Sequence, residues 1–255
     1  MSGPGPPLWL DHASVAVPDL AAAVEHMERR LGLGATVSPD APERHSRVFL
    51  DRSYLEVSTG SPSADWEATL FFLRFSHPVA LRAHLEAAGI DHRFGEYEGV
   101  DGTWDDVEIR VGAVPLPILV RRTAPAAVAR DWPPALRQEH RCGARSLAAV
   151  HVEVPSLDEA IGAYHRLLAT DEASPPVAKA GSGGGRARIP LASGELVVHE
   201  GSPSGSVGVV LGVRSLATPR AALGGSMRPT DEDDVAWVDP AETCGLRLGF
   251  TEAGG

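Results

Sequence analysis

Residues 10–20, Leu10-Asp-His-Ala-Ser-Val-Ala-Val-Pro-Asp-Leu20, and residues 147–157, Leu147-Ala-Ala-Val-His-Val-Glu-Val-Pro-Ser-Leu157, share one pattern that decides the fold. Each is a run of β-branched and small residues followed by Val-Pro, a short polar residue and Leu. Proline ends a strand, and Asp and Ser are residue types that cap helices. Each stretch therefore predicts a strand that leads directly into a helix, and apolar residues at helical spacing follow both stretches.

The same order of segments occurs four times along the chain. Further predicted strands cover residues 35–38, 45–51, 53–58, 69–75, 92–98, 104–111, 117–122, 186–191, 195–200, 207–213, 235–238 and 246–251. Further predicted helices cover residues 79–88 and 219–223. The order β-α-β-β-β defines four modules, at residues 9–60, 67–122, 147–201 and 206–252.

The four modules predict two domains. Residues 1–122 form the N-terminal domain, residues 123–146 form a connector rich in Pro, Ala and Arg, and residues 147–255 form the C-terminal domain. The glycine-rich residues 181–185 are predicted to be a loop. The sequence leaves open whether module one pairs with module two or with module four.

Composition narrows the class of protein. The chain has 255 residues, of which 43% are hydrophobic and 22% charged, as expected for a globular fold. Its formal net charge of −11 disfavours nucleic acid and anionic membranes as partners. The first residues lack a basic region and an apolar core, so there is no signal peptide and a cytoplasmic location is expected. The two cysteines, Cys142 and Cys244, are expected to be free thiols.

Several short motifs resemble the vicinal-oxygen-chelate (VOC) superfamily, which includes glyoxalase I, extradiol dioxygenases, methylmalonyl-CoA epimerase and antibiotic-resistance proteins. The motifs are residues 10–12 with 17–20, residues 53–57 and the final hairpin at residues 238–248. Residues 101–103 and 116–118 are most similar to the subgroup of glyoxalase-like domain proteins. The resemblance covers residues 8–252 and implies an α+β fold in which the four βαβββ modules form two half-barrel cups.

The resemblance also implies a site. In the superfamily, a His from the first strand and a Glu from the fourth strand of a module hold a divalent metal, which the substrate chelates. His12 and Glu56 occupy these positions in module one and are the predicted metal ligands and catalytic residues, with His45 as a further candidate. Imidazole and carboxylate suit Zn, Ni, Co, Mn or Fe, although the metal can also be absent.

The other modules depart from this pattern. The equivalent positions are Thr69 and Leu119 in module two, Ala149 and Val197 in module three, and Gly208 and Gly249 in module four. Extradiol dioxygenases draw their ligands from the last two modules, so ring-cleaving chemistry is not expected. His151 lies two residues beyond the family position in module three, on the same strand face.

Other side chains are candidates for binding a ligand without a metal, because aromatic and Arg side chains recognise carbonyl-rich ligands. The candidate ligand-binding residues are Tyr54, Trp104, Arg110, His151 and Glu153. The alternative for Tyr54, Trp104 and Arg110 is ordinary sheet packing, and Glu153 with His151 could be an acid–base couple or a structural ion pair. The remaining histidines considered, His77, His92, His140 and His199, are expected at the surface or in loops.

Three functions remain open at this level. The first is a glyoxalase-like enzyme that acts on a small oxygenated metabolite by isomerase- or lyase-type proton transfer, with or without a metal. The second is a metal-free protein that binds or sequesters a small molecule, similar to bleomycin-resistance proteins. The third is a structural module with an empty cup. The expected partner is a small molecule, and the chain is expected to be a monomer or a homodimer.

Overall fold

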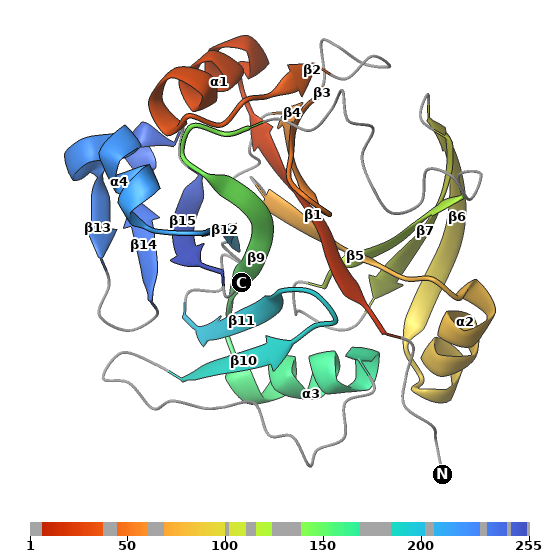
Figure 1. Ribbon diagram of the computed structural model, residues 1–255. Helices are drawn as coiled ribbons and strands as arrows, with labels where there is room; N and C mark the ends of the chain where they lie inside the picture. Colours follow the sequence, from red (N-terminus) through yellow and green to blue (C-terminus); the bar gives the residue numbers. More distant parts are fainter. Residues whose placement is uncertain are drawn as a thin grey trace. The chain divides into compact units, whose positions relative to one another are not determined.

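The strands form two mixed sheets in the computed structural model, which describes residues 7–37, 45–60, 69–99, 102–110, 116–123, 139–168, 185–201, 207–229, 234–243 and 246–253. The eight-stranded sheet has the order β2-β3-β4-β1-β5-β8-β7-β6, and the seven-stranded sheet has the order β10-β11-β9-β12-β15-β14-β13. The first sheet contains the strands of modules one and two, and the second contains those of modules three and four (Figure 1).

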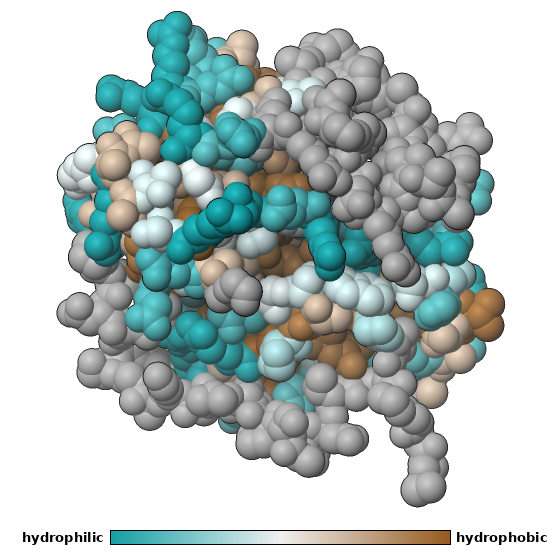
Figure 2. All heavy atoms as spheres, in the orientation of Figure 1, coloured by the Kyte–Doolittle hydropathy of each residue, from teal (hydrophilic) through white to brown (hydrophobic). Residues whose placement is uncertain are grey.

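Module one consists of β1 (Trp9–Val17), α1 (Leu20–His26), a π-helical continuation η1 (Met27–Leu31), β2 (Thr36–Val37), β3 (His45–Phe49) and β4 (Tyr54–Thr59). The carboxylate of Asp19 accepts a hydrogen bond from the backbone N–H of Ala22 at 2.9 Å, as the sequence predicts for a helix cap. The helix ends at Gly32, which adopts a left-handed φ of 66°. Figure 2 shows hydrophilic atoms over the solvent side of α1 and η1, where Glu25, Glu28, Arg29 and Arg30 are exposed.

Module two consists of β5 (Thr69–Arg74), α2 (Pro78–Ala87), β6 (Asp91–Gly99), β7 (Gly102–Arg110) and β8 (Ile118–Thr123). Helix α2 begins with Pro78, whose missing N–H costs nothing in the first turn. Leu81 and Leu85 form its buried stripe, and Val107 and Leu119 are the buried residues of the sheet face toward it. Alternation along the strands leaves the other face of β7 and β8 partly exposed.

Module three consists of β9 (Ala144–Val154), α3 (Leu157–Leu168), β10 (Arg186–Pro190) and β11 (Glu195–Glu200). Module four consists of β12 (Val207–Val213), α4 (Ala217–Leu223), η3 (Gly224–Ser226), β13 (Met227–Pro229), β14 (Val235–Val238), η4 (Pro240–Glu242) and β15 (Arg247–Glu252). Helix α3 packs on β10 and β11, and α4 packs on η1.

The α+β fold with two half-barrel cups is confirmed, and the helices and strands lie close to the predicted ranges. Strand β9 begins at Ala144, inside the predicted connector, and the short strand β13 was not predicted. Most of the predicted loop at residues 181–185 lies outside the described residues. Cys142 is a buried free thiol, and Cys244 lies outside the described residues.

The chain divides into two compact units. The first comprises Met1–Asp11, Phe71–Ala124 and His151–Gly205, and the second comprises His12–Leu70, Pro125–Val150 and Ser206–Gly255. Modules two and three therefore belong mainly to the first unit, whereas modules one and four belong mainly to the second. Module one therefore shares its unit with module four, whereas it shares its sheet with module two. No helix among the described residues combines the length and apolar character that a bilayer crossing needs.

Candidate functional site

A polar sheet face in module one carries His12 and Glu56. In the parallel pair of β1 and β4, His12 lies opposite Tyr54 and Ser14 lies opposite Glu56. All four side chains therefore project from the same face, since residues two apart share a face and Cα partners point the same way. The Glu56 side chain is 15% exposed, so its carboxylate does not project into bulk solvent.

Strand β3 adds two further polar side chains to this face. Its antiparallel register with β4 places His45 opposite Ser58 and Arg47 opposite Glu56. The alternate residues of β4, Leu55 and Val57, are fully buried on the other face, toward helix α1. One face is thus apolar and helix-covered, while the other gathers ionisable groups.

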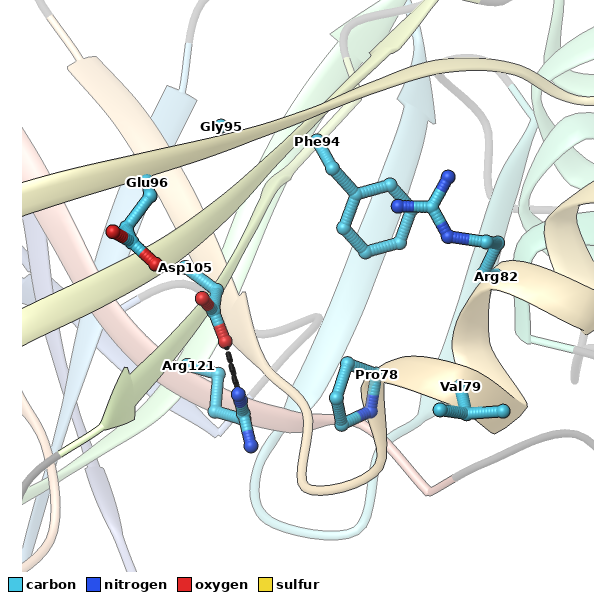
Figure 3. A pocket seen from close by; sticks show the side chains of 8 residues that line it. All are labelled: Pro78, Val79, Arg82, Phe94, Gly95, Glu96, Asp105 and Arg121. Atoms are coloured by element: carbon cyan, nitrogen blue, oxygen red, sulfur yellow. Dashed lines mark hydrogen bonds and ion pairs between the residues drawn. The ribbon is translucent and has the colours of Figure 1, made fainter.

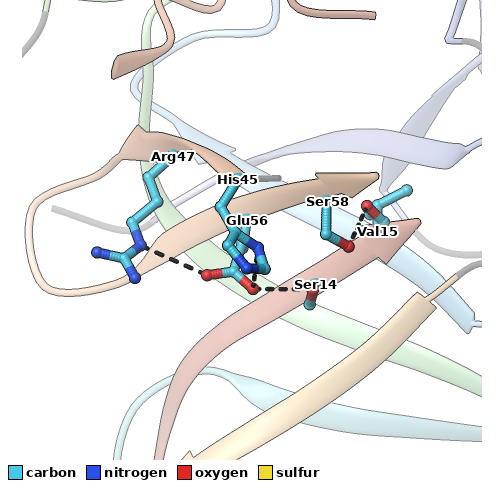
Figure 4. A network of polar contacts seen from close by, with 6 residues as sticks. All are labelled: Ser14, Val15, His45, Arg47, Glu56 and Ser58. Carbon is cyan, nitrogen blue, oxygen red and sulfur yellow. Dashed lines mark hydrogen bonds and ion pairs between the residues drawn. The ribbon is translucent and has the colours of Figure 1, made fainter. Parts of the chain in front are cut away.

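Three side chains surround the Glu56 carboxylate (Figure 4). The hydroxyl of Ser14 donates to Oε1 at 3.1 Å, and Nε of Arg47 donates to Oε2 at 3.4 Å. Nδ1 of His45 lies 3.7 Å from Oε1. A carboxylate that is largely withdrawn from water needs such partners, and the guanidinium supplies a compensating charge. Sequence reasoning missed Ser14 and Arg47 as site residues, although alternation along β1 and β3 places both on the face of Glu56.

The Nδ1 atom of His45 is buried and has no hydrogen-bond partner among the described residues. A buried polar atom without a partner is costly and calls for an explanation in terms of function, water or a ligand. Since this nitrogen lies 3.7 Å from Oε1 of Glu56, the two groups form a candidate acid–base pair.

His12 has a different environment from the one that the sequence predicts. Its ring stacks on Tyr54 with centroids 4.2 Å apart and an interplanar angle of 11°. Arg47 lies on the same aromatic ring, with Cζ 5.5 Å from the centroid. Ser14, Arg47 and His45, rather than His12, surround the Glu56 carboxylate. The roles predicted for His12, His45, Glu56 and Tyr54 stay predictions.

The residues of module one do not fit the metal that the superfamily implies. Both Glu56 oxygens already accept hydrogen bonds, and the ring of His12 stacks on Tyr54. In the described part of the chain, no three His, Cys, Asp or Glu side chains are grouped so as to hold a metal ion. No catalytic step is therefore derived through a metal at this face.

Module four has an indole where the superfamily places ligands. A Cβ added to Gly249 would lie 2.6 Å from Val235 and 2.9 Å from Trp237, and one added to Gly208 would lie 3.2 Å from Trp237. Cζ of Arg247 lies 4.8 Å from the centroid of the Trp237 ring system. The side chain of Trp237 thus occupies the space over both ligand positions, and a His or Glu there would have to displace it.

Module two contains a hollow of about 500 Å³ between the start of α2 and strands β6 to β8 (Figure 3). It is lined by Pro78, Val79, Arg82, Phe94, Gly95, Glu96, Asp105 and Arg121. Nε of Arg121 donates to Asp105 at 2.6 Å, and Arg82 lies over Phe94 with Cζ 4.0 Å from the ring centroid. None of the predicted site residues is among those that line this hollow, so the hollow and the candidate chemistry do not coincide. The polar face of module one carries the stronger candidate chemistry, because Nδ1 of His45 is buried beside the Glu56 carboxylate without a hydrogen-bond partner among the described residues.

The other predicted ligand-binding residues lie in the first unit. Trp104 is half-buried on β7. Arg110 is the last residue of that strand, and its side chain is not among those that the structure describes. His151 and the half-buried Glu153 lie on β9. Nδ1 of His151 is 2.8 Å from Nε2 of His199, and His199 is half-buried on strand β11 rather than in a loop.

His140 lies in a loop before β9, which is one of the two expected places, but it is buried, at only 7% exposure. Its Nε2 donates to the carbonyl of Phe49 at 2.8 Å, and its Nδ1 accepts from the backbone N–H of Gly34 at 3.1 Å. These two bonds require the neutral imidazole. Burial lowers the pKa of His140, and the hydrogen bond to Phe49 offsets this only in part. His140 therefore anchors the end of β3, the strand that carries His45 and Arg47.

Comparisons with known proteins identify a family and similar folds. Residues 10–168 match the family model described as a glyoxalase-like domain. The fold is similar to the 2,3-dioxygenase LapB from Pseudomonas sp. KL28, with a TM-score of 0.68 and 15% identity over 99% of this chain and 94% of the other. An extradiol ring-cleaving dioxygenase from B. fuscum has a TM-score of 0.63 and 12% identity over 100% of this chain and 74% of its own. A hypothetical protein from Staphylococcus aureus has a TM-score of 0.62 and 10% identity over 96% and 99%. No curated protein sequence matches the chain.

Proposed function

This chain belongs to the glyoxalase-like domain family, and we propose that it is an enzyme that moves a proton on a small oxygenated metabolite, in an isomerase- or lyase-type reaction. The carrying observation is the pair of Glu56 and His45 on the polar face of module one. A carboxylate at 15% exposure faces a buried imidazole nitrogen that has no hydrogen-bond partner among the described residues. Such a pair suits general acid–base catalysis, in which one group removes a proton and the other returns it.

The proposed chemistry is enolisation of a carbonyl compound. Glu56 takes the proton from the carbon next to the carbonyl, and the C–H electron pair moves into the carbonyl oxygen as an enolate. Ser14 and Arg47 hold the carboxylate in position, at 3.1 and 3.4 Å. Arg47 also places a permanent positive charge beside the site, where it can stabilise the negative oxygen. His45 then donates a proton to the product.

The test is exchange of deuterium into small 2-oxo and 2-hydroxycarbonyl metabolites in D₂O, followed by proton NMR with the full chain. Wild type is expected to catalyse exchange into at least one compound. Glu56→Gln is expected to slow that exchange by about 100-fold or more, because removal of a general base typically costs that much. Glu25→Gln is the matched control, since Glu25 is exposed on α1 and pairs with Arg29. Exchange that is unchanged in Glu56→Gln would refute the proposal.

A metal-free binding or sequestration protein is the second candidate. Two observations support it. In module one, Glu56 accepts hydrogen bonds from Ser14 and Arg47. In module four, the side chain of Trp237 lies over Gly208 and Gly249, where the superfamily places metal ligands. This candidate predicts tight binding of a small molecule in a thermal-shift screen, with no turnover and no deuterium exchange.

A further inference from the structure

We propose that His151 and His199 in module three form a binding site for one divalent transition-metal ion. His151 is 1% exposed on β9, and His199 is half-buried on β11, its neighbour in the second sheet. Both residues belong to the first unit, whereas Glu56 and His45 belong to the second. The site is thus independent of the proposed proton-transfer site.

The geometry of the two rings suits an ion between them. Their facing nitrogens are 2.8 Å apart, with centroids 5.0 Å apart and an interplanar angle of 23°. The nitrogens therefore point toward one another instead of the rings lying face to face. In this contact one nitrogen donates a proton and the other accepts it, and a tautomer shift that moves this proton to the other nitrogen of the donor ring frees both facing nitrogens as lone-pair donors.

The spacing is close to that of two imidazoles on one ion. Zinc and similar ions bind imidazole nitrogen at about 2.0–2.1 Å, so two nitrogens on one tetrahedral ion stand about 3.3–3.4 Å apart. The observed 2.8 Å has to open by about half an ångström, and both rings have to turn so that their lone pairs converge on the ion. With the shared proton moved, the ion takes its place and both nitrogens act as lone-pair donors.

The backbone holds the two imidazoles in place. Strand β11 pairs with β10, with His199 opposite Arg186, and helix α3 packs on both strands. Val198 and Leu196 are buried on the alternate face of β11, which fixes the direction of His199. Ligands on a packed sheet are positioned more precisely than ligands on loops.

The pair is not the family's own metal position. By alignment of the two opening stretches, that position in module three falls on Ala149 and Val197, neither of which can bind a metal. His151 and His199 each lie two residues further along the same strands, and a shift of two residues keeps the same face. The superfamily arrangement of one ligand from each of these strands is retained, but displaced.

The charges nearby and the ligand types set the class of ion. Arg186 lies opposite His199, Glu153 lies two residues from His151, and Arg188 pairs with Glu195 at 3.2 Å, so the nearby charges are mixed. Imidazole selects Zn²⁺, Cu²⁺, Ni²⁺ or Co²⁺ over Mg²⁺ and Ca²⁺. With two protein ligands the remaining coordination positions are open to water.

The experiment is a calorimetric titration of the full chain, freed of metal with a chelator, with Ni²⁺ and separately with Co²⁺ at about pH 7.5, where imidazole is neutral. Wild type is expected to bind one ion per chain. His199→Ala and His151→Ala are each expected to weaken binding by at least about tenfold, because each removes one of two ligands. His165→Ala, on α3 of the same module, is the matched control and is expected to bind as wild type does.

If His199→Ala fails to fold, His199→Gln takes its place, because glutamine keeps a hydrogen-bonding group at this position. Circular dichroism checks that the variant is folded. The proposal is overturned if wild type binds neither ion, or if a folded His199 variant binds as tightly as wild type. It is also overturned if Glu56→Ala, rather than His199→Ala, abolishes binding, because the ion would then occupy module one. None of these outcomes depends on whether the chain catalyses deuterium exchange.

Discussion

Burial changes the chemistry of individual residues in this chain, and His140 is the clearest case. Its neutral ring bridges the carbonyl of Phe49 and the N–H of Gly34, and its pKa is lowered from 6.5 because burial disfavours the charged form. Cys142 shows the same effect with the opposite sign, since burial raises the pKa of its thiol to about 11. Cys142 is therefore an unreactive thiol, and His140 is a structural group that needs to stay uncharged.

Stability is expected to fall in mild acid because of His140. Above pH 6.5 the imidazole is neutral in both the folded and the unfolded chain, so its contribution to the free energy of unfolding is fully present. Below this value the unfolded chain takes up the proton first, and stability is lost until the pH reaches the lowered pKa of the folded state. Urea unfolding of wild type across this range measures the loss.

His140→Gln removes the titrating group but keeps one donor and one acceptor. The variant is expected to lose less stability than wild type as the pH falls, whereas His165→Gln, on α3, should lose as much as wild type. An equally steep loss in His140→Gln and wild type would show that other groups cause the acid sensitivity.

At the scale of the elements, strand alternation and helix caps depend on residues close together in the sequence. The packing of a side chain against a neighbouring strand depends on residues far apart in the sequence. In module four the sheet tolerates Trp237 only because Gly249 and Gly208 have no side chains. Glycine weakens a strand on its own, so its presence at these points indicates close packing by a neighbour.

Gly249→Ala is expected to lower the free energy of unfolding by about 1–3 kcal/mol, the usual cost of overpacking a core. The added Cβ would lie 2.6 Å from Cγ1 of Val235 and 2.9 Å from Trp237, so one of the two must shift. Denaturant unfolding measures the change. Gly225→Ala is the control, because nothing lies within 4 Å of its added Cβ. The double variant Gly249→Ala with Val235→Ala should recover part of the loss, and a purely additive result would contradict the clash.

At the scale of the whole molecule, the second unit joins segments that lie far apart in the chain, among them residues 12–70 and 125–150. The hydroxyl oxygen of Ser53 accepts a hydrogen bond from the backbone N–H of Leu147 at 3.0 Å, and both residues are buried. The backbone N–H of Asp51 donates to the carbonyl of Arg145 at 2.6 Å. The turn between β3 and β4 is thus tied to the first residues of β9.

Ser53→Ala is expected to destabilise the chain by about 1–3 kcal/mol, because the N–H of Leu147 is then buried without an acceptor. Thermal or urea unfolding followed by circular dichroism measures the loss. Ser76→Ala changes an exposed serine before α2 and should leave the unfolding midpoint unchanged. Equal midpoints for wild type and Ser53→Ala would mean that this link contributes nothing to stability.

The sequence by itself determined the modules, because each strand and helix follows from spacing, prolines and caps within a dozen residues. The shared face of His12 and Glu56 depends on the parallel register of β1 with β4, which alternation along a single strand does not set. Only the tertiary structure decided which side chains meet. The register of β3 brings Arg47 and His45 to Glu56, the neighbouring strands β9 and β11 join His151 to His199, and packing over long sequence distances buries His140. It also decided that module one shares a unit with module four. These contacts join residues far apart in the chain, and register and packing across such distances are set by the energy of the whole fold rather than by any local pattern.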